Sequence, residues 1–459
     1  MKKTTDTSDA LLHGDIFKTM LSLSVPAILG MVVIGLYNFM DAVFVGQMVG
    51  PEAMTAVKVS YPFTLLNSGI ATLIGTGSSS VLSRAIGKRD QATVNKIMGN
   101  LMCMVFLLSV AITVIGLIFA PNLLAFSGAE GNVLTEATEY LRIVFWGSLF
   151  VNFGQAANMV MRGEGKLKIA MAIMAMGAIL NIILDPIMIT IVGADKGAAG
   201  AAFATVISQV TQALFTLWYF LKKSDNVRIG RIRIEKDLVG SVLSVGFSAM
   251  LMQVMSMFQQ TIMYSTAAQY GGGQWQTILG ASLSLQAFSF IPLWGISQGF
   301  QPAVGTNYGA GNFNRVKKFT MTFILSATTL AMVFYLPIML APKGMLSMFI
   351  TDSAITTAGA PMLRLLFTSY ITYGFLILAI TFFQAIGKGG VAAVLALSRQ
   401  LIVFLPLVVL LPKVHGLGIT GIFLAQLITD FIVLILAAVF MIREFAKMKQ
   451  EASVVKAAA

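Results

Sequence analysis

Two carboxylates stand in long apolar stretches of this sequence, where a charge is costly. Asp41 lies in NFMDAVFVGQ (38–47) and Asp185 in LNIILDPIMI (180–189). In a helix, residues four apart share a face, so Tyr37 lies beside Asp41 and Asn181 beside Asp185. Nearby carboxylates in a low dielectric resist double ionisation. The pattern predicts a site that loads and unloads a proton or a small cation; the simpler alternative is that each aspartate only bonds a neighbouring helix.

A second set of opposite charges lies in the other half of the chain. Arg399 and Asp430 each fall about midway along an apolar stretch. An ionisable group in lipid needs a partner or a cavity, so these two residues are predicted to form a buried ion pair. A static salt bridge fits this pattern, and so does a role in substrate binding or gating.

The second half also carries polar, aromatic and thioether side chains within its apolar stretches. Aromatic faces and flexible methionines suit varied apolar cations, so as a group these residues predict a substrate cavity. Plain helix packing is the alternative for any one of them. The candidates are Gln253, Met257, Gln260, Tyr264, Gln286, Phe290 and Trp294.

The elements that position these residues are predicted to be membrane-spanning helices. The 459 residues are 57% hydrophobic and only 11% charged, against about 25% charged in soluble domains. A spanning helix needs about 20 apolar residues. Twelve stretches qualify, at 16–47, 53–80, 97–119, 136–160, 168–192, 198–221, 238–269, 278–302, 319–340, 360–385, 391–411 and 417–442.

Lysine and arginine orient these spans. They concentrate in 84–96, 162–168, 222–237 and 309–318, which all lie on one side if the spans alternate. The positive-inside rule then predicts a multi-pass protein of the inner (plasma) membrane with both termini in the cytoplasm. The same bias explains the net charge of +12 without any nucleic-acid partner.

The Gly, Pro and charged residues that separate the spans recur after about 222 positions. Lys96 falls on Lys318, and the GlyLys pair at 165–166 falls on 387–388. We therefore expect an all-α integral membrane fold with two pseudo-symmetric six-helix bundles, 1–221 and 238–459, joined by a basic cytoplasmic linker at 222–237. An even number of spans per copy makes the copies parallel, a build in which substrate binds between the halves. Asp41 falls on a methionine and Asp185 on leucines, so only the first half carries the carboxylate pair.

Enzyme chemistry finds little support in the sequence. No Walker A or HExxH sequence is present, and the single cysteine, Cys103, excludes an internal disulfide. We expect no enzyme activity, no cofactor and no metal site, apart from Na⁺ at Asp41 and Asp185.

The chain resembles the multidrug and toxic compound extrusion (MATE) transporters, in their DinF/MepA-like prokaryotic branch. The resemblance spans essentially the whole chain. It rests on YNFMDAVFVGQ (37–47), RAIGKRD (84–90), NYGAGNFNRV (307–316), MRGEGKLK (161–168) and NIILDPIMI (181–189).

The resemblance implies multidrug efflux by antiport, in which amphipathic organic cations leave the cell in exchange for H⁺ or Na⁺, by a protein that acts as a monomer. It places the coupling cation at Tyr37, Asp41, Asn181 and Asp185. An asparagine of the fourth span and a threonine of the sixth usually join them; the matching positions are Asn158, with Gln155 as a rival, and Thr205. The alternatives are a flippase of lipid-linked precursors and a membrane-embedded lipid transferase.

Overall fold

The structure is a computed structural model that describes residues 7–193, 197–224 and 226–458. Within these ranges the side chains of residues 7, 8, 38, 39, 41–43, 45–47, 51, 52 and 454–458 lie outside the description. Asp41 belongs to this last group, so only the backbone of its helix places it. Every regular element in the described ranges is a helix, as the composition predicts.

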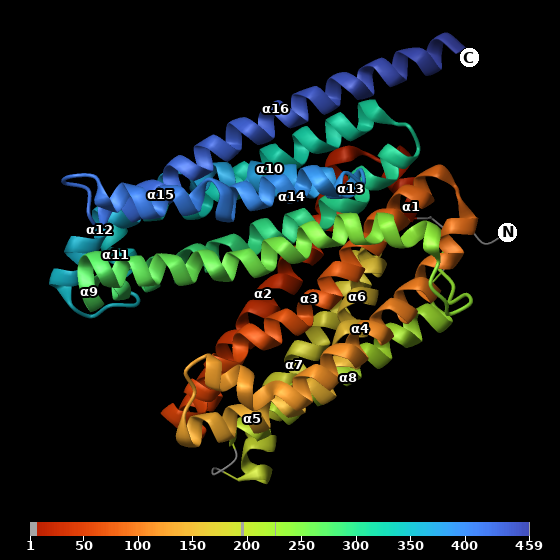
Figure 1. The fold of residues 1–459 in the computed structure, drawn as a ribbon. Helices are drawn as coiled ribbons and strands as arrows, with labels where there is room; N and C mark the ends of the chain where they lie inside the picture. The colour runs from red at the N-terminus through yellow and green to blue at the C-terminus, as the bar shows by residue number, and fades with distance from the viewer. Residues whose placement is uncertain (1–6, 194–196, 225, 459) are drawn as a thin grey trace. The chain divides into compact units, whose positions relative to one another are not determined.

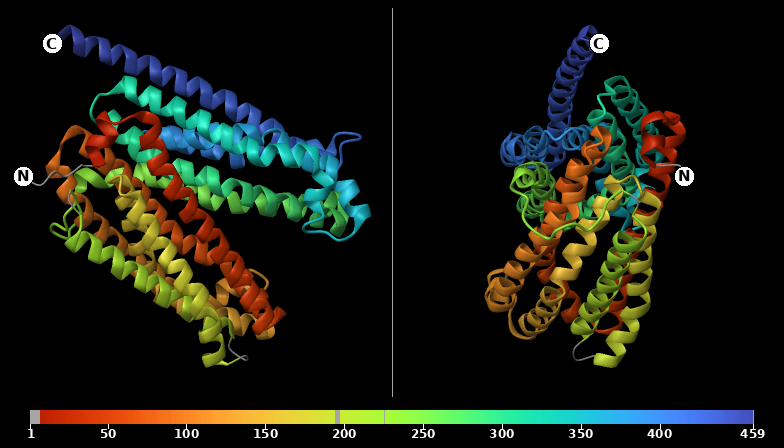
Figure 2. Two further views of the ribbon diagram at one scale, coloured as in Figure 1. Left: turned by 180° about the vertical axis from the view of Figure 1, so that it is seen from behind. Right: turned by 90° about the vertical axis from the view of Figure 1, so that its right-hand side faces the viewer.

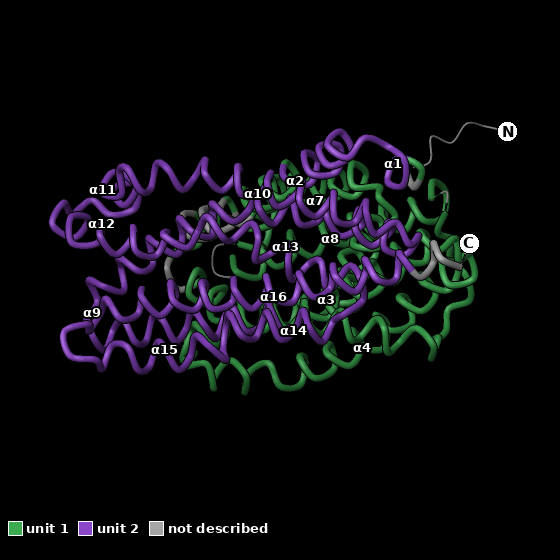
Figure 3. The backbone as a smooth tube through the Cα atoms, turned by 90° about the horizontal axis from the view of Figure 1, so that it is seen from above, with its two compact units in different colours: residues 1–9, 29–250 green, residues 10–28, 251–459 purple. Residues whose placement is uncertain are grey.

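The chain forms two compact units (Figure 3). Unit 1 consists of residues 1–9 and 29–250, and unit 2 of residues 10–28 and 251–459. Three helices are divided between the units. The start of α1 (Thr7–His13) belongs to unit 1 and the rest of it to unit 2, the start of α2 (Ile16–Met48) belongs to unit 2, and the start of α9 (Lys236–Gly309) belongs to unit 1. The division of the sequence at the basic linker 222–237 stays a prediction.

Unit 1 is built around helices that run side by side (Figure 1). A Gly147 break bends the fourth predicted span by 55° into two helices, so this span is not the single straight helix expected. Besides the shared helices, the elements are α3 (Pro51–Lys88), α4 (Gln91–Phe126), α5 (Gly131–Trp146), α6 (Ser148–Gly163), α7 (Leu167–Val192) and α8 (Gly197–Lys222). The short α1 (Thr7–His13) precedes them.

Unit 2 contains more interrupted helices. The long α9 turns back at Gly272, whose φ of 67° lies in the left-handed region that favours glycine. The other elements are α10 (Phe313–Leu340), α11 (Pro342–Leu346), α12 (Ser353–Thr368), η2 (Tyr370–Thr372), α13 (Tyr373–Ala385), α14 (Gly389–Leu397), the π-helical η3 (Ser398–Ile402), α15 (Phe404–Leu410), η4 (Leu411–Lys413) and α16 (Thr420–Ala458). Figure 2 shows α16 as one continuous helix up to Ala458.

The helices account for the spans expected from the sequence. Within the described ranges, nine helices are long and apolar enough to cross a membrane, or ten if the bent pair α5–α6 counts as one span. The hairpin at Gly272 makes α9 two crossings, and the 38-residue α3 is long enough to cross although its composition is more polar. Together these elements make the twelve-helix, all-α membrane fold that the sequence predicts.

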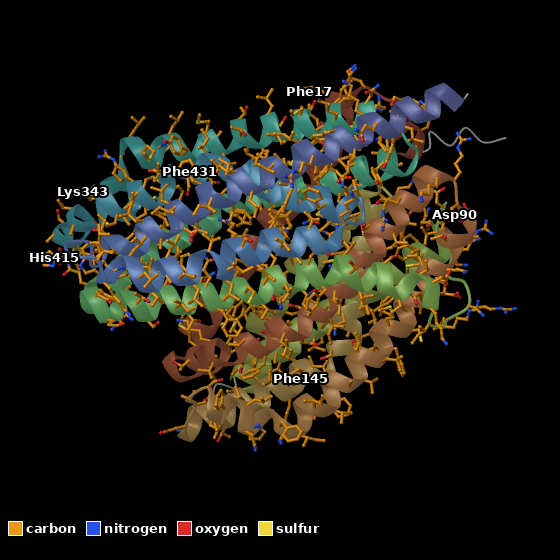
Figure 4. All side chains as sticks on the ribbon, turned by 45° about the horizontal axis from the view of Figure 1, so that its top comes forward. Phe17, Asp90, Phe145, Lys343, His415 and Phe431 are labelled. Carbon is orange, nitrogen blue, oxygen red and sulfur yellow. The ribbon has the colours of Figure 1, made fainter. Side chains whose placement is uncertain are left out.

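The outer faces of the helices are apolar, which suits lipid. Phe17 on α2 is 55% exposed and Phe431 on α16 is 43% exposed, and both project from the surface (Figure 4). A soluble monomer rarely exposes so many large apolar side chains. Lys343 and His415, which lie between predicted spans, are at the same end of unit 2 (Figure 4).

Candidate functional site

Small residues bring α7 and α8 together around the candidate cation site in unit 1. The α8 helix begins GAAGAA (197–202), and Gly200 packs directly against the backbone of α7. A Cβ atom at Gly200 would lie only 2.8 Å from the Cα of Ile189. Since Asp185 precedes Ile189 by one helical turn on the same face, this close packing places its carboxylate in the dry interface between the two helices.

Three of the predicted residues meet in this interface. The Asn181 Nδ2 donates to Oδ1 of Asp185 at 3.2 Å and lies 3.4 Å from Oγ1 of Thr205 on α8. Asp185 is fully buried and Asn181 nearly so. Pro186 follows directly and removes one backbone donor from α7. The arrangement is a carboxylate, an amide and a hydroxyl with several oxygen atoms at close range, a set that can hold a proton or a small hard cation.

The α2 helix contacts α7 at a point nearer to the N-terminus of α7 than this cluster. A Cβ atom at Gly30 would lie 2.6 Å from Sδ of Met171, so the two helices touch there. Tyr37 follows Gly30 by seven residues and therefore lies on the same face of α2; its side chain is half-buried. The backbone of Asp41 continues that face one turn further. The Asp41 side chain lies outside the described residues, so its distance to Asp185 stays a prediction.

Asn158 lies elsewhere in unit 1. It is fully buried on α6, and its Nδ2 donates to the backbone oxygen of Ala170 at 2.8 Å. Ala170 lies in the first turn of α7, about 22 Å along the helix from Asp185 at 1.5 Å per residue. The structure therefore does not bring Asn158 to the cluster of Asn181, Asp185 and Thr205. Its rival Gln155 is half-buried on the same helix.

Unit 2 contains a second buried carboxylate with a full set of donors. Asp430 on α16 is fully buried and forms an ion pair with Arg399, with Nε and Oδ1 2.9 Å apart. Ser369 donates its hydroxyl to Oδ2 at 2.7 Å, and the Gln426 amide lies 3.1 Å from both carboxylate oxygens. Gln259 on α9 in turn donates to Oε1 of Gln426 at 2.7 Å.

Part of the predicted substrate cavity gathers at Tyr373, beside this ion pair. Gln286 donates to the Tyr373 hydroxyl at 2.9 Å. The Phe290 ring packs edge-on against Tyr373, with centroids 6.4 Å apart, and Trp294 lies 6.0 Å beyond Phe290. Phe290 and Trp294 on the second arm of α9 and Tyr373 on α13 together form an aromatic wall.

The other cavity candidates occupy the first arm of α9. Tyr264 lies at its end, with the hydroxyl 3.2 Å from where a Cβ of Gly280 would stand. Gln253 and Met257 are half-buried, and Gln260 is exposed, so the structure does not gather Gln260 with the aromatic wall.

Sequence reasoning missed Ser369 and Gln426 as partners of Asp430. Gln426 precedes Asp430 by four residues, just as Asn181 precedes Asp185. An amide four residues before an intramembrane aspartate was therefore a usable signal in both units. Ser369 had no comparable signal, because the helix break that positions it follows from tertiary packing.

The fold and these sites define a class of protein: a multi-pass helical membrane protein whose two units each bury a hydrogen-bonded carboxylate. Comparison with known proteins places the chain within that class. The MatE family model matches residues 26–187 and 248–410, one stretch in each half. The chain belongs to the MATE family of multidrug efflux transporters.

Individual relatives agree with this assignment. The chain is 27% identical over 417 residues to the multidrug export protein MepA of Staphylococcus aureus, a match that covers 90% of this chain and 91% of MepA. Two crystal structures of MATE, in a bent and in a straight conformation, each match with a TM-score of 0.91 and 27% identity. Each match covers 98% of this chain and 100% of the solved chain. Members of the family are transporters rather than enzymes.

Proposed function

We propose that this protein is a secondary active antiporter that exports amphipathic organic cations in exchange for H⁺, with Na⁺ as the alternative coupling ion. The observation that carries the proposal is the fully buried Asp185, hydrogen-bonded to Asn181 beside Thr205. A carboxylate in this position is costly unless it binds a proton or cation during the cycle. The name of MepA supports drugs as the cargo.

Protonation is proposed to act through the shape of α2. This helix contains Pro26, which removes a backbone donor and clashes with the carbonyl four residues earlier, so the helix bends easily there. Uptake of a proton from outside at Asp41 and Asp185 removes charge, α2 bends, and the affinity of the protein for the drug falls. Solved relatives described as bent and straight conformations of MATE support a transporter that alternates between two shapes.

The aromatic wall in unit 2 suits the cargo. Phe290, Trp294 and Tyr373 present ring faces, which attract organic cations and accept varied apolar shapes. We propose that the protein acts as a monomer in the inner membrane with both termini in the cytoplasm, without a cofactor and without ATP.

Ethidium efflux from cells tests the coupling ion. Cells carrying the wild type, Asp41→Asn or Asp185→Asn are compared while the proton gradient is collapsed and Na⁺ is varied independently. We expect wild-type efflux to stop with the proton gradient and to ignore Na⁺, and both variants to lose it. Thr190→Val is the matched control, because Thr190 lies on α7 but its hydroxyl is exposed and bonds only the local Pro186 carbonyl.

Two results would contradict the proposal. Full proton-dependent efflux by both aspartate variants would remove the coupling role of these carboxylates. A wild type that exports no dye under any gradient would remove multidrug efflux itself, and would favour the flippase of lipid-linked precursors.

A further inference from the structure

Arg399 lies near the middle of its membrane span, where a positive charge is energetically costly. It follows the start of α14 by ten residues, which places it about 15 Å along the span, half of the roughly 30 Å hydrocarbon thickness. Asp430 is likewise ten residues into α16. Snorkelling to the headgroups is therefore out of reach for this side chain.

The guanidinium is held on one edge and one face. Its Nε donates to Asp430 at 2.9 Å, and its central carbon lies 4.3 Å from the centroid of the Tyr373 ring. Asp430 is itself fixed by Ser369 and Gln426. Because each anchor is buried and hydrogen-bonded, Arg399 is a preorganised group rather than a mobile one.

The two members of the ion pair differ in what they offer a ligand. The Arg399 side chain is 20% exposed, whereas Asp430 is 0% exposed. A guanidinium has five N–H donors in a planar fork, and the described partners of this one are Asp430 and Tyr373. A molecule arriving at this pair therefore meets the partly exposed cation, not the buried carboxylate.

The helix around Arg399 is distorted in a way that fits a binding role. Residues Ser398–Ile402 form a π-helical turn, in which the amide of Val403 donates to the carbonyl of Ser398 at 3.0 Å. Such single π turns inside α-helices are frequent at functional sites. Arg399 lies in this turn and over the ring of Tyr373, a member of the aromatic wall.

We propose that Arg399 is a specificity-determining residue that binds the carboxylate of zwitterionic amphipathic molecules, whose ring systems pack on Phe290, Trp294 and Tyr373. This inference rests on the proposed function, since it names a substrate class for the same transporter. A planar fork binds a carboxylate through two parallel hydrogen bonds, and it does so most strongly where water is excluded. The buried Asp430 keeps the site electrically balanced before the ligand arrives.

Two dyes that differ only at the carboxylate test the inference. Rhodamine 110 is a zwitterion with a free carboxylate, and rhodamine 123 is its methyl ester. Binding of both to the purified protein is measured by fluorescence polarisation. The double variant Arg399→Gln/Asp430→Asn removes both charges together, so neither is left buried without its partner.

We expect the double variant to weaken rhodamine 110 binding by at least about tenfold and to leave rhodamine 123 binding nearly unchanged. Arg364→Gln is the matched control in the same unit: its Nε donates to the backbone oxygen of Met339 at 3.0 Å, and its side chain is exposed. It should change neither dye's affinity.

A second measurement needs only the wild type, in case the double variant does not fold. Phenylglyoxal modifies accessible guanidinium groups, and peptide mass spectrometry locates the modified arginine. We expect modification of Arg399 that rhodamine 110 prevents and rhodamine 123 does not. Equal protection by the two dyes, or an unreactive Arg399, would overturn the inference.

The outcomes separate this inference from the proposed function. If the protein binds and exports rhodamine 123 but the double variant binds rhodamine 110 as tightly as the wild type does, multidrug efflux stands and the role of Arg399 is refuted. If the wild type binds and exports neither dye, both fall together.

Discussion

At the scale of single residues, the two buried aspartates share a motif and differ in their neighbours. Each accepts a hydrogen bond from an amide four residues earlier, Asn181 in unit 1 and Gln426 in unit 2. Asp430 also forms an ion pair with Arg399, which compensates its charge. Asp185 instead lies beside Asn181 and Thr205, in the site proposed for the coupling cation.

Ser369→Ala tests how much the Asp430 network contributes to stability. The substitution removes the 2.7 Å bond to Oδ2 of a fully buried carboxylate. We expect a loss of about 1–3 kcal/mol in the free energy of unfolding, measured as a lower Tm in detergent. Ser347→Ala is the control, because that exposed hydroxyl bonds only the local Gly344 carbonyl. An unchanged Tm for Ser369→Ala would contradict the expectation.

Glu164 predicts a pH dependence of stability outside the spans. Its carboxylate lies buried in the turn between α6 and α7 and accepts hydrogen bonds from Tyr219 at 2.9 Å and Ser224 at 3.0 Å. Burial raises the pKa of Glu164 above its ordinary value of 4.5, and these hydrogen bonds only partly oppose the shift. The folded state therefore holds the proton more tightly than the unfolded state does.

The sign of the effect follows from linkage. The contribution of Glu164 to stability is fully present below pH 4.5 and is lost as the pH rises through the raised pKa of the folded state. Glu164→Gln, which cannot ionise, should flatten the decline of Tm over about pH 4 to 7. Identical Tm profiles for the variant and the wild type would show that this carboxylate does not titrate in that range.

At the scale of elements, close helix packing positions the candidate cation site. Gly200 lets α8 reach the backbone of α7 one turn beyond Asp185. In unit 2 the partners of Asp430 come from breaks in the helices. Ser369 lies next to the η2 turn, and Arg399 lies in the π turn η3. One repeated scaffold thus carries two different polar sites.

Gly200→Ala tests the α7–α8 contact. The added methyl group would lie 2.8 Å from the Cα of Ile189, so the helices must separate. We expect destabilisation of about 1–3 kcal/mol, together with reduced ethidium efflux, because Thr205 moves away from Asn181. Gly240→Ala is the control: that helical glycine has open space around it, and alanine should be neutral or slightly stabilising there. Equal behaviour of the two variants would refute this account.

Pro26→Ala tests the bend of α2. Alanine restores the backbone donor, which favours a straight helix. We expect strongly reduced efflux with tetraphenylphosphonium binding retained, because binding needs the cavity while export needs the bend. Full efflux by this variant would exclude Pro26 as the hinge.

At the scale of the whole molecule, α2 and α9 each belong to both units. The break in membership falls after Ile28 in α2, two residues beyond Pro26, and after Met250 in α9. Within unit 2, Gly295 packs against Ile28 and Gly299 against Leu23, which ties the first part of α2 to α9. A bend at Pro26 therefore acts on a helix that both units hold.

Coupling between drug and proton predicts a result on the purified protein. If the two ligands alter each other's affinity, the effect must be equal in both directions. We expect tetraphenylphosphonium binding to release protons, measured calorimetrically as a binding enthalpy that varies with the ionisation enthalpy of the buffer. The same enthalpy in every buffer would mean that drug binding moves no proton, and would contradict proton coupling at the drug-binding step.

Several features of the site were predictable from local patterns. The positions of Asp185 and Asn181 on one face followed from helical spacing, and the long apolar stretches predicted the helices themselves. Asn158 shows what local patterns do not predict. It is expected near Asp185, but its side chain donates to a backbone oxygen in the first turn of α7 instead. Depth along a neighbouring helix depends on where two helices cross, which no local pattern encodes.

The sequence by itself determined the membrane environment, the all-helical class, the repeat and the residues able to carry charge across lipid. These follow from hydropathy and helical periodicity, which are properties of contiguous residues. Only the tertiary structure decided that α5 and α6 bend at Gly147, that Ser369 and Gln426 fix Asp430, and that Arg399 lies on Tyr373 with its side chain partly exposed. Those contacts join residues far apart in the chain, so they exist only after the helices pack.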